Sequence, residues 1–152
     1  MILALALAIG VIAGLRAMMA PAAISWAAHL GHIDLSGTWL AFLGYRFTPW
    51  VFTVLAVVEL VTDQLPSTPS RKVPQQFGAR IVLGGLSGAA IGASGGALAT
   101  GAILGVVGAI IGTYGGAAAR ARLAAMFGRD LPAALIEDVV AIAGAYAIFS
   151  HL

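Results

Sequence analysis

Residues 75–120 read QQFGARIVLGGLSGAAIGASGGALATGAILGVVGAIIGTYGGAAAR, and Arg80 is the only charged residue before the last position of this stretch. A helix needs about 20 mainly apolar residues to cross about 30 Å of hydrocarbon. The stretch supplies that length twice, over 75–94 and 97–120. The glycine pair within 94–96 predicts a tight turn between the two runs, because adjacent glycines interrupt helices. We therefore expect a hairpin of two membrane-spanning helices.

The composition of the whole chain supports the same class. Of its 152 residues, 61% are hydrophobic and 9% are charged, and the mean hydropathy is +1.00. A soluble domain has about 45–50% apolar and about 25% charged residues, and a disordered chain has still more charge. The chain has no Cys, which excludes thiol chemistry and disulfides. Its net charge of +2 is too small and dispersed for nucleic-acid binding. We expect one integral membrane domain over residues 1–152, with the lipid bilayer as its main partner.

Further apolar stretches complete the predicted bundle. Two of them, 48–65 and 131–149, are long enough to span a membrane. Met1–Leu30 is ambiguous, because as one helix it would be about 45 Å long, too long for one span and too short for two. Arg16 and Pro21 lie near its middle, so we expect a break there, giving either one kinked span or two short helices. The predicted fold is an all-α polytopic transmembrane bundle of about five to six helices, with the first segment broken near Arg16–Pro21.

Basic residues predict the orientation of the bundle. Arg71 and Lys72 lie in the loop before residue 75, and we expect Arg120 and Arg122 in the loop before the last helix. The positive-inside rule places both loops in the cytoplasm, with the C-terminus outward. On the outer side we expect a belt of aromatic residues: Trp39, Tyr45, Phe47, Trp50, Tyr146 and Phe149. The expected location is the bacterial inner (cytoplasmic) membrane. The N-terminus is inside if Met1–Leu30 crosses once and outside if it crosses twice.

Glycines recur at four-residue spacing on both helices of the hairpin, at 84, 88 and 92 and again at 101, 105, 108, 112 and 116. This spacing places them on one helix face, where backbones can approach closely. Packing between the two neighbouring helices is the interpretation we favour. A homodimer through the Gly-rich helices is the alternative.

Ionisable residues within apolar helices are the candidate site. Each costs about 2.5–3.5 kcal/mol in a membrane unless it is paired or hydrated. Glu59, Arg80 and Glu137 each lie about 9–10 Å from the same predicted face. Asp63 follows Glu59 by one helical turn, and Asp138 neighbours Glu137. Two interpretations stay open: a structural ion-pair layer in which Arg80 bridges carboxylates, or a polar cavity that binds a cation, a proton or a small polar solute.

Arg16 and Tyr114 complete the predicted ion or solute pathway, whereas His29 and His32 do not belong to it. Arg16, near the helix break, can snorkel, cap carbonyl groups or attract an anion. Tyr114 is placed to hydrogen-bond into the same layer. His29 and His32 have a spacing that can hold a metal, but no third strong ligand is nearby, so we predict no metal site and no cofactor.

The stretch from Glu59 to Arg71, ELVTDQLPSTPSR, followed by Gly78-Ala-Arg80 and a Gly/Ala-rich helix, resembles a family of small multi-pass bacterial membrane proteins, the domain of unknown function four-one-two-six. Gly14-Leu15-Arg16 also fits the resemblance, which covers most of the chain. It implies an integral membrane bundle and assigns no activity or functional residues.

Three functions fit these observations. The leading hypothesis is a small transporter or channel for an ion or small polar solute, with a polar cavity facing the cytoplasm. The second is a structural or assembly protein whose charges only hold helices together. A lipid-acting intramembrane enzyme, with a headgroup site at Glu59 and Asp63, is the third; we expect that the protein is not an enzyme. A hydrated cavity reaching Glu59 and Glu137 favours transport, and a dry, fully paired cluster favours the structural role.

Overall fold

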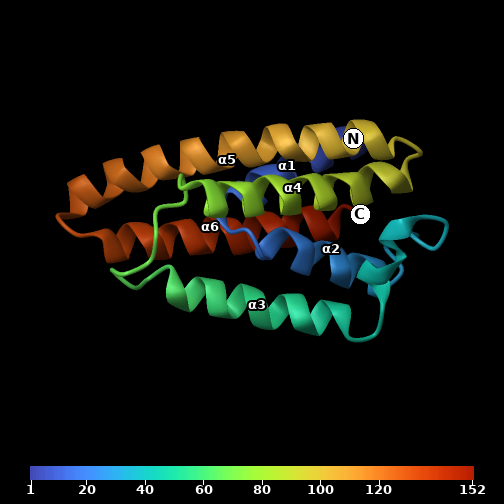
Figure 1. The fold of residues 1–152 in the computed structure, drawn as a ribbon, viewed down its shortest axis with the longest axis horizontal. Coiled ribbons are helices and arrows are strands. Elements are labelled where there is room, and N and C mark those ends of the chain that lie inside the picture. Colours follow the sequence, from blue (N-terminus) through green and yellow to red (C-terminus); the bar gives the residue numbers. More distant parts are fainter.

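The computed structural model describes all 152 residues, and every regular element is helical, which confirms the predicted all-α class. The elements are α1 (Ile2–Leu15), α2 (Met19–His29), the 3-10 helix η1 (Trp39–Gly44), α3 (Thr48–Thr62), α4 (Pro74–Ser94), α5 (Leu98–Phe127) and α6 (Asp130–Ser150). They form an elongated bundle along the 30-residue α5 (Figure 1). By length and composition, α4, α5 and α6 can each cross a membrane, whereas α1 and α3 are apolar but shorter.

Two helix boundaries differ from the prediction. The third helix ends at Thr62 and not at Leu65, because Gln64 and Leu65 already belong to hydrogen-bonded turns. α5 continues past Arg120 to Phe127, where Gly128 adopts a left-handed φ of 70°. Alanines and other good helix formers fill this extra length, and glycine ends it because it alone adopts positive φ without a steric penalty. The basic residues on α5 therefore belong to a helix and not to a loop.

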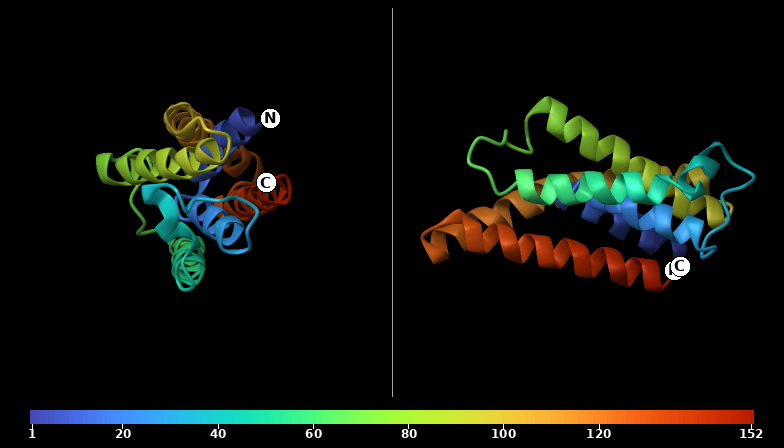
Figure 2. Two further views of the ribbon diagram at one scale, coloured as in Figure 1. Left: turned by 90° about the vertical axis from the view of Figure 1, so that its right-hand side faces the viewer. Right: turned by 90° about the horizontal axis from the view of Figure 1, so that it is seen from below.

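The first apolar segment is broken at the predicted place. α1 ends at Leu15, α2 begins at Met19, and Arg16 between them is extended, with φ −138° and ψ 109°. The two helices run in opposite directions, so the segment is a hairpin and not a kinked helix (Figure 1). Its tip lies inside the bundle. Both chain termini consequently lie at the same end of the molecule as η1 (Figures 1 and 2).

Glycines bring α1 and α4 against α5 at backbone distance. A Cβ atom added at Gly105 would lie 2.1 Å from the carbonyl oxygen of Gly84 on α4. One added at Gly108 would lie 2.2 Å from the carbonyl oxygen of Leu7 on α1. Such contacts exist only where the side chain is a hydrogen atom. The predicted packing between neighbouring helices is therefore present, and it includes α1. The glycine pattern is accounted for without a second copy of the chain.

The two ends of the bundle differ in character. At the end that holds the termini, large aromatic side chains are exposed: Trp39, Tyr45, Phe47, Trp50 and Tyr146. The loop that joins α3 to α4 and the junction of α5 and α6 lie at the opposite end. There α4 diverges from α5 and α6 (Figure 2). These aromatic residues thus lie at the end of the molecule opposite to the loop with Arg71 and Lys72 and to the basic C-terminal part of α5 (Figure 1).

The close glycine contacts lead to a stability prediction. In Gly105→Ala the new methyl group meets backbone atoms of α4, which cannot move aside as a side chain can. We expect a loss of about 1–3 kcal/mol or more in unfolding free energy, the usual cost of overpacking. Thermal unfolding in detergent measures it. Gly115→Ala is the matched control, because its Cβ meets nothing within 4 Å. Equal stability of the two variants would contradict the packing argument.

Candidate functional site

The candidate site forms around the tip of the α1–α2 hairpin. α1 ends there with carbonyl groups that no amide of the same helix satisfies. The Nη1 atom of Arg80, on α4, donates to the carbonyl oxygens of both Gly14 and Leu15 at 2.8 Å. Thr113 Oγ1, on α5, lies 3.5 Å from the same Gly14 oxygen. A cation at this position also complements the negative end of the helix dipole.

The start of α2 has the opposite partner. The backbone amides of Ala17 and Met18 each donate to one carboxylate oxygen of Glu59, both at 2.8 Å. Glu59 lies on α3, so this carboxylate caps the N-terminus of a helix remote in sequence. Backbone groups without an internal partner are costly in an apolar setting. Glu59 and Arg80 together remove that cost on the two sides of the break.

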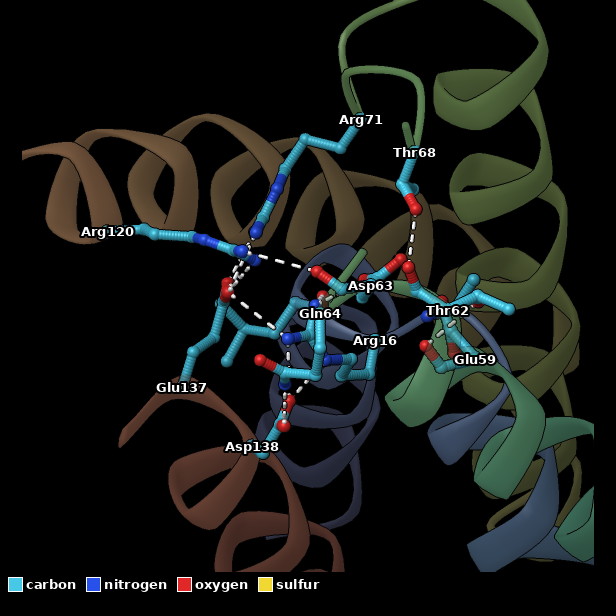
Figure 3. A network of polar contacts seen from close by, with 12 residues as sticks. Arg16, Glu59, Thr62, Asp63, Gln64, Thr68, Arg71, Arg120, Glu137 and Asp138 are labelled. Carbon is cyan, nitrogen blue, oxygen red and sulfur yellow. Dashed lines mark hydrogen bonds and ion pairs between the residues drawn. The ribbon is translucent and has the colours of Figure 1, made fainter. Parts of the chain in front are cut away.

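Arg16 directly follows α1 and has no exposed surface. Figure 3 shows its side chain among those of Asp63, Gln64 and Asp138. Its Nη1 atom is 2.5 Å from Asp63 Oδ2 on α3. Its Nε and Nη2 atoms are both 2.6 Å from Asp138 Oδ1 on α6. Nη2 is also 3.6 Å from Glu137 Oε2. One buried guanidinium therefore ties the hairpin tip to both α3 and α6.

Glu137 connects this centre to a second group of charges. The guanidinium of Arg71, from the loop between α3 and α4, pairs with both oxygens of Glu137. Arg120 Nη1, on α5, lies 3.4 Å from Glu137 Oε2. Space for these contacts comes from Gly116, where an added Cβ would lie 3.0 Å from both the Arg71 and the Glu137 side chains. The loop is thereby fastened to α5 and α6.

Two further residues, Asp130 and Gln64, belong to the network. Arg120 binds Asp130 at the start of α6, with Nε–Oδ1 and Nη2–Oδ2 distances of 2.9 and 2.5 Å. The Gln64 side-chain amide donates to Asp138 Oδ2 at 2.7 Å. With these contacts, every acidic residue of the chain except Asp34 belongs to one network.

A polar cavity of about 370 Å³ opens beside the network, at the end where α4 diverges. Its charged lining residues are Asp63, Arg71, Arg80, Arg120 and Asp130. The network therefore has two parts. One part borders the cavity, and the other, around Arg16 and Asp138, is buried and paired away from it. Glu59 and Glu137 do not line the cavity.

A larger groove of about 460 Å³ runs between α2, α3 and α6, but it is apolar. The hydroxyl of Thr53 in its lining already accepts a hydrogen bond from Trp26 Nε1 at 3.0 Å and donates to the Pro49 carbonyl at 2.7 Å. The groove offers no charged group to a polar ligand. The polar cavity is the candidate site for that reason.

The structure brings together six of the seven predicted site residues: Arg16, Glu59, Asp63, Arg80, Glu137 and Asp138. Their roles differ from the expected ones. The sequence suggests that Arg80 bridges carboxylates and that Arg16 is separate, whereas Arg16 is the bridge and Arg80 caps α1. The hairpin causes this exchange, because it carries Arg16 to the depth of α3 and α6. Tyr114 lies outside the network, is 50% exposed and packs on the ring of Phe77 at 5.7 Å.

Four network residues are absent from the sequence prediction: Gln64, Arg71, Arg120 and Asp130. Arg71 and Arg120 serve there only as markers of the cytoplasmic side. The available signal is their charge close to apolar helix ends, since long arginine side chains can reach back along a helix. Nothing in the sequence shows that both of them reach the same carboxylate.

The histidine pair lies at the other end of the molecule. His29 Nδ1 is 3.3 Å from the carbonyl oxygen of Gly44. The His32 ring packs against Phe149, with the ring centroids 4.7 Å apart. Asp34, in the same loop, accepts hydrogen bonds from the amide and hydroxyl of Ser36, which hold the pKa of its carboxyl below the ordinary value. Each of the three residues thus has a local partner.

No protein-family model, no curated protein and no solved structure matches this chain. The resemblance to the family of unknown function stays a prediction.

Arg16 provides the sharpest test of the network. Arg16→Met leaves the buried carboxylates of Asp63 and Asp138 without their main cation. Removing one partner of a buried ion pair costs about 3–5 kcal/mol, so we expect a loss of that size in unfolding free energy. Chemical unfolding in detergent measures it. The matched control is Arg122→Met, since Arg122 is exposed and forms no ion pair. A loss below about 1 kcal/mol, typical of an exposed pair, would contradict a central role for Arg16.

Proposed function

We propose that this chain is a small integral membrane transporter or channel for an ion or a small polar solute. The observation that supports this function best is the polar cavity beside the broken helix. Asp63 both lines that cavity and contacts the buried Arg16. A solute in the cavity would thus be one side chain away from the interior of the bundle.

The proposed topology follows from the two ends of the molecule. α3, α4, α5 and α6 would cross the bilayer, and the α1–α2 hairpin would enter from the outer side and end inside it. The loop with Arg71 and Lys72 and the junction after Arg122 would face the cytoplasm, in agreement with the positive-inside rule. Both termini would then lie outside. In this arrangement the protein is a multi-pass protein of the bacterial inner membrane, and the cavity opens to the cytoplasm.

The hairpin tip shares one physical feature with the ion-binding parts of transporters, an interrupted helix with backbone groups unpaired within the helix. In those proteins, helices interrupted at membrane depth direct unpaired carbonyl and amide groups toward ions and substrates. In this chain the same backbone groups are held by Arg80 and Glu59. We propose that a solute is admitted when these contacts rearrange, because each cap can be replaced by a ligand of the same charge.

The alternative is a structural or assembly role, and a separate observation favours it. Around Arg16 the network is buried and its carboxylates are paired, the arrangement expected of charges that only fix helix positions. If the whole network is static, the cavity is only a gap between diverging helices and has no function of its own. Transport and structural roles therefore make opposite predictions for the residue shared by both parts of the network.

The residue shared by the two parts of the network is Asp63. We expect purified wild-type protein in proteoliposomes to conduct protons, alkali cations or phosphate down imposed gradients. In Asp63→Asn the flux should fall about tenfold or more, which corresponds to about 1.4 kcal/mol of lost interaction. Fluorescent indicators trapped inside the vesicles follow proton and potassium flux, and radiolabelled phosphate follows the anion.

The control for the flux experiment is Asp34→Asn, which removes a carboxylate outside the network and should leave flux unchanged. Thermal unfolding of each variant separates lost flux from lost folding. Absence of flux in the wild type under every gradient would contradict the proposal. Normal flux with lower stability in Asp63→Asn would favour the structural role.

A further inference from the structure

The arginines of the network differ in how they use their hydrogen-bonding edges. A guanidinium presents pairs of parallel N–H groups that match the two oxygens of a carboxylate or a phosphate. Arg71 uses its Nη1 and Nη2 atoms in this way on Glu137. Arg120 uses Nε and Nη2 on Asp130. Arg16 directs Nε and Nη2 at Asp138. Each of these three edges therefore faces a carboxylate, although Nη2 of Arg16, 2.6 Å from Asp138 Oδ1, forms no hydrogen bond.

Arg80 has an edge that no group occupies. Its Nη1 atom is used by the carbonyl groups at the end of α1. Its Nε atom is buried and has no hydrogen-bond partner. Its Nη2 atom lies 3.8 Å from Glu59 Oε1, which is beyond hydrogen-bond distance. The side chain is only 2% exposed, so water does not freely satisfy these donors. A buried donor without a partner is costly and needs an explanation.

The free edge belongs to a residue that lines the polar cavity. The lining contains three basic residues, Arg71, Arg80 and Arg120, and two acidic ones, Asp63 and Asp130, so basic residues are in excess there. Both carboxylates are held by arginines, Asp63 by Arg16 and Asp130 by Arg120. The carboxylate of Glu59 lies 3.8 Å from Arg80 Nη2, and no hydrogen bond joins the two groups.

Neutral donors lie in the same lining. Ser70 accepts a bond from the Lys72 amide, which leaves its hydroxyl proton free to donate. Gln76 lies in the first turn of α4, a helix that has no acidic residue there and no side-chain cap. The amide end of α4 adds a partial positive charge on this side. Several donors around one cation suit an anion with more oxygens than a carboxylate.

From this geometry we infer that the polar cavity binds a phosphate-type oxyanion on the free Nε/Nη2 edge of Arg80. This inference rests on the proposed function, because it names the solute class of the same cavity. The oxyanion is either free phosphate or the phosphate of a lipid headgroup, since the cavity would open at the cytoplasmic membrane surface. Two of its oxygens would accept hydrogen bonds from the Nε and Nη2 atoms of Arg80, and Ser70 and Gln76 supply donors for the others.

Arg80→Lys tests the inference, because lysine keeps the charge and loses the paired N–H groups. Inorganic phosphate is titrated into the purified protein in detergent, and binding is followed by calorimetry. We expect saturable binding to the wild type and about tenfold weaker binding to Arg80→Lys, the consequence of losing one charge-assisted hydrogen bond. Arg122→Lys, which changes an exposed arginine outside the cavity, should bind as the wild type does.

A second variant covers the case in which Arg80→Lys does not fold. The side chain of Gln76 makes no hydrogen bond within the chain, so Gln76→Ala should fold normally and bind phosphate several-fold more weakly. The lipid source is tested by native mass spectrometry of protein extracted from phosphatidylglycerol vesicles. Phospholipid retained by the wild type and lost in Arg80→Lys, without binding of inorganic phosphate, assigns the headgroup.

The inference is overturned if neither phosphate nor phospholipid binds, or if wild type and variants bind equally. Its failure is distinguishable from failure of the proposed function. Phosphate binding without any flux removes the transport proposal and leaves the oxyanion site. Proton or cation flux without phosphate or phospholipid binding removes the oxyanion site and leaves transport.

Discussion

The arrangement of this bundle depends on one buried cation, Arg16. A guanidinium without exposed surface is tolerated only with anionic partners, because the cost of leaving it unpaired is several kcal/mol. Asp63 and Asp138 supply them from two different helices. Asp63 and Asp138 in turn depend on Arg16, because neither carboxylate has a closer cation. The depth of the hairpin tip, the end of α3 and the first turns of α6 are therefore set together. Gln64 and Glu137 extend the same constraint outward.

Glycine makes this meeting of charges geometrically feasible. α5 contacts both α1 and α4 at backbone distance, which brings α1 and α4 close to each other. That proximity lets Arg80 reach the last carbonyl groups of α1. Gly116 has a similar role one level further along α5, where it leaves room for the pair of Arg71 and Glu137. Small residues thus serve the electrostatics as well as the packing, and a methyl group at these positions acts on both.

The network has a buried part around Arg16 and a second part that lines the polar cavity, and this division bears on function. Around Arg16 the charges satisfy one another, which is what a structural role requires. Beside the cavity, Arg80 keeps a buried Nε atom without a hydrogen-bond partner, and Asp63 belongs to the lining. A static buried part and a part that responds to a solute can coexist in one protein, because Asp63 belongs to both. The apolar groove along α2 lies elsewhere and takes no part in this chemistry.

The sequence by itself determines the all-α fold class and the positions of most of the helices. Hydropathy and glycine spacing are local patterns, so they predict the 75–120 hairpin, its internal packing and the break near Arg16. The rise per residue along each helix also predicts that Glu59, Arg80 and Glu137 share one level, but it leaves Arg16 separate from them. Only the tertiary structure decides which charges pair. Arg16 became the centre because the first segment folds back as a hairpin, and Arg71 and Arg120 joined because long side chains converge on Glu137 from different elements. Distances between residues remote in sequence depend on the packing of whole helices, and no local pattern encodes them.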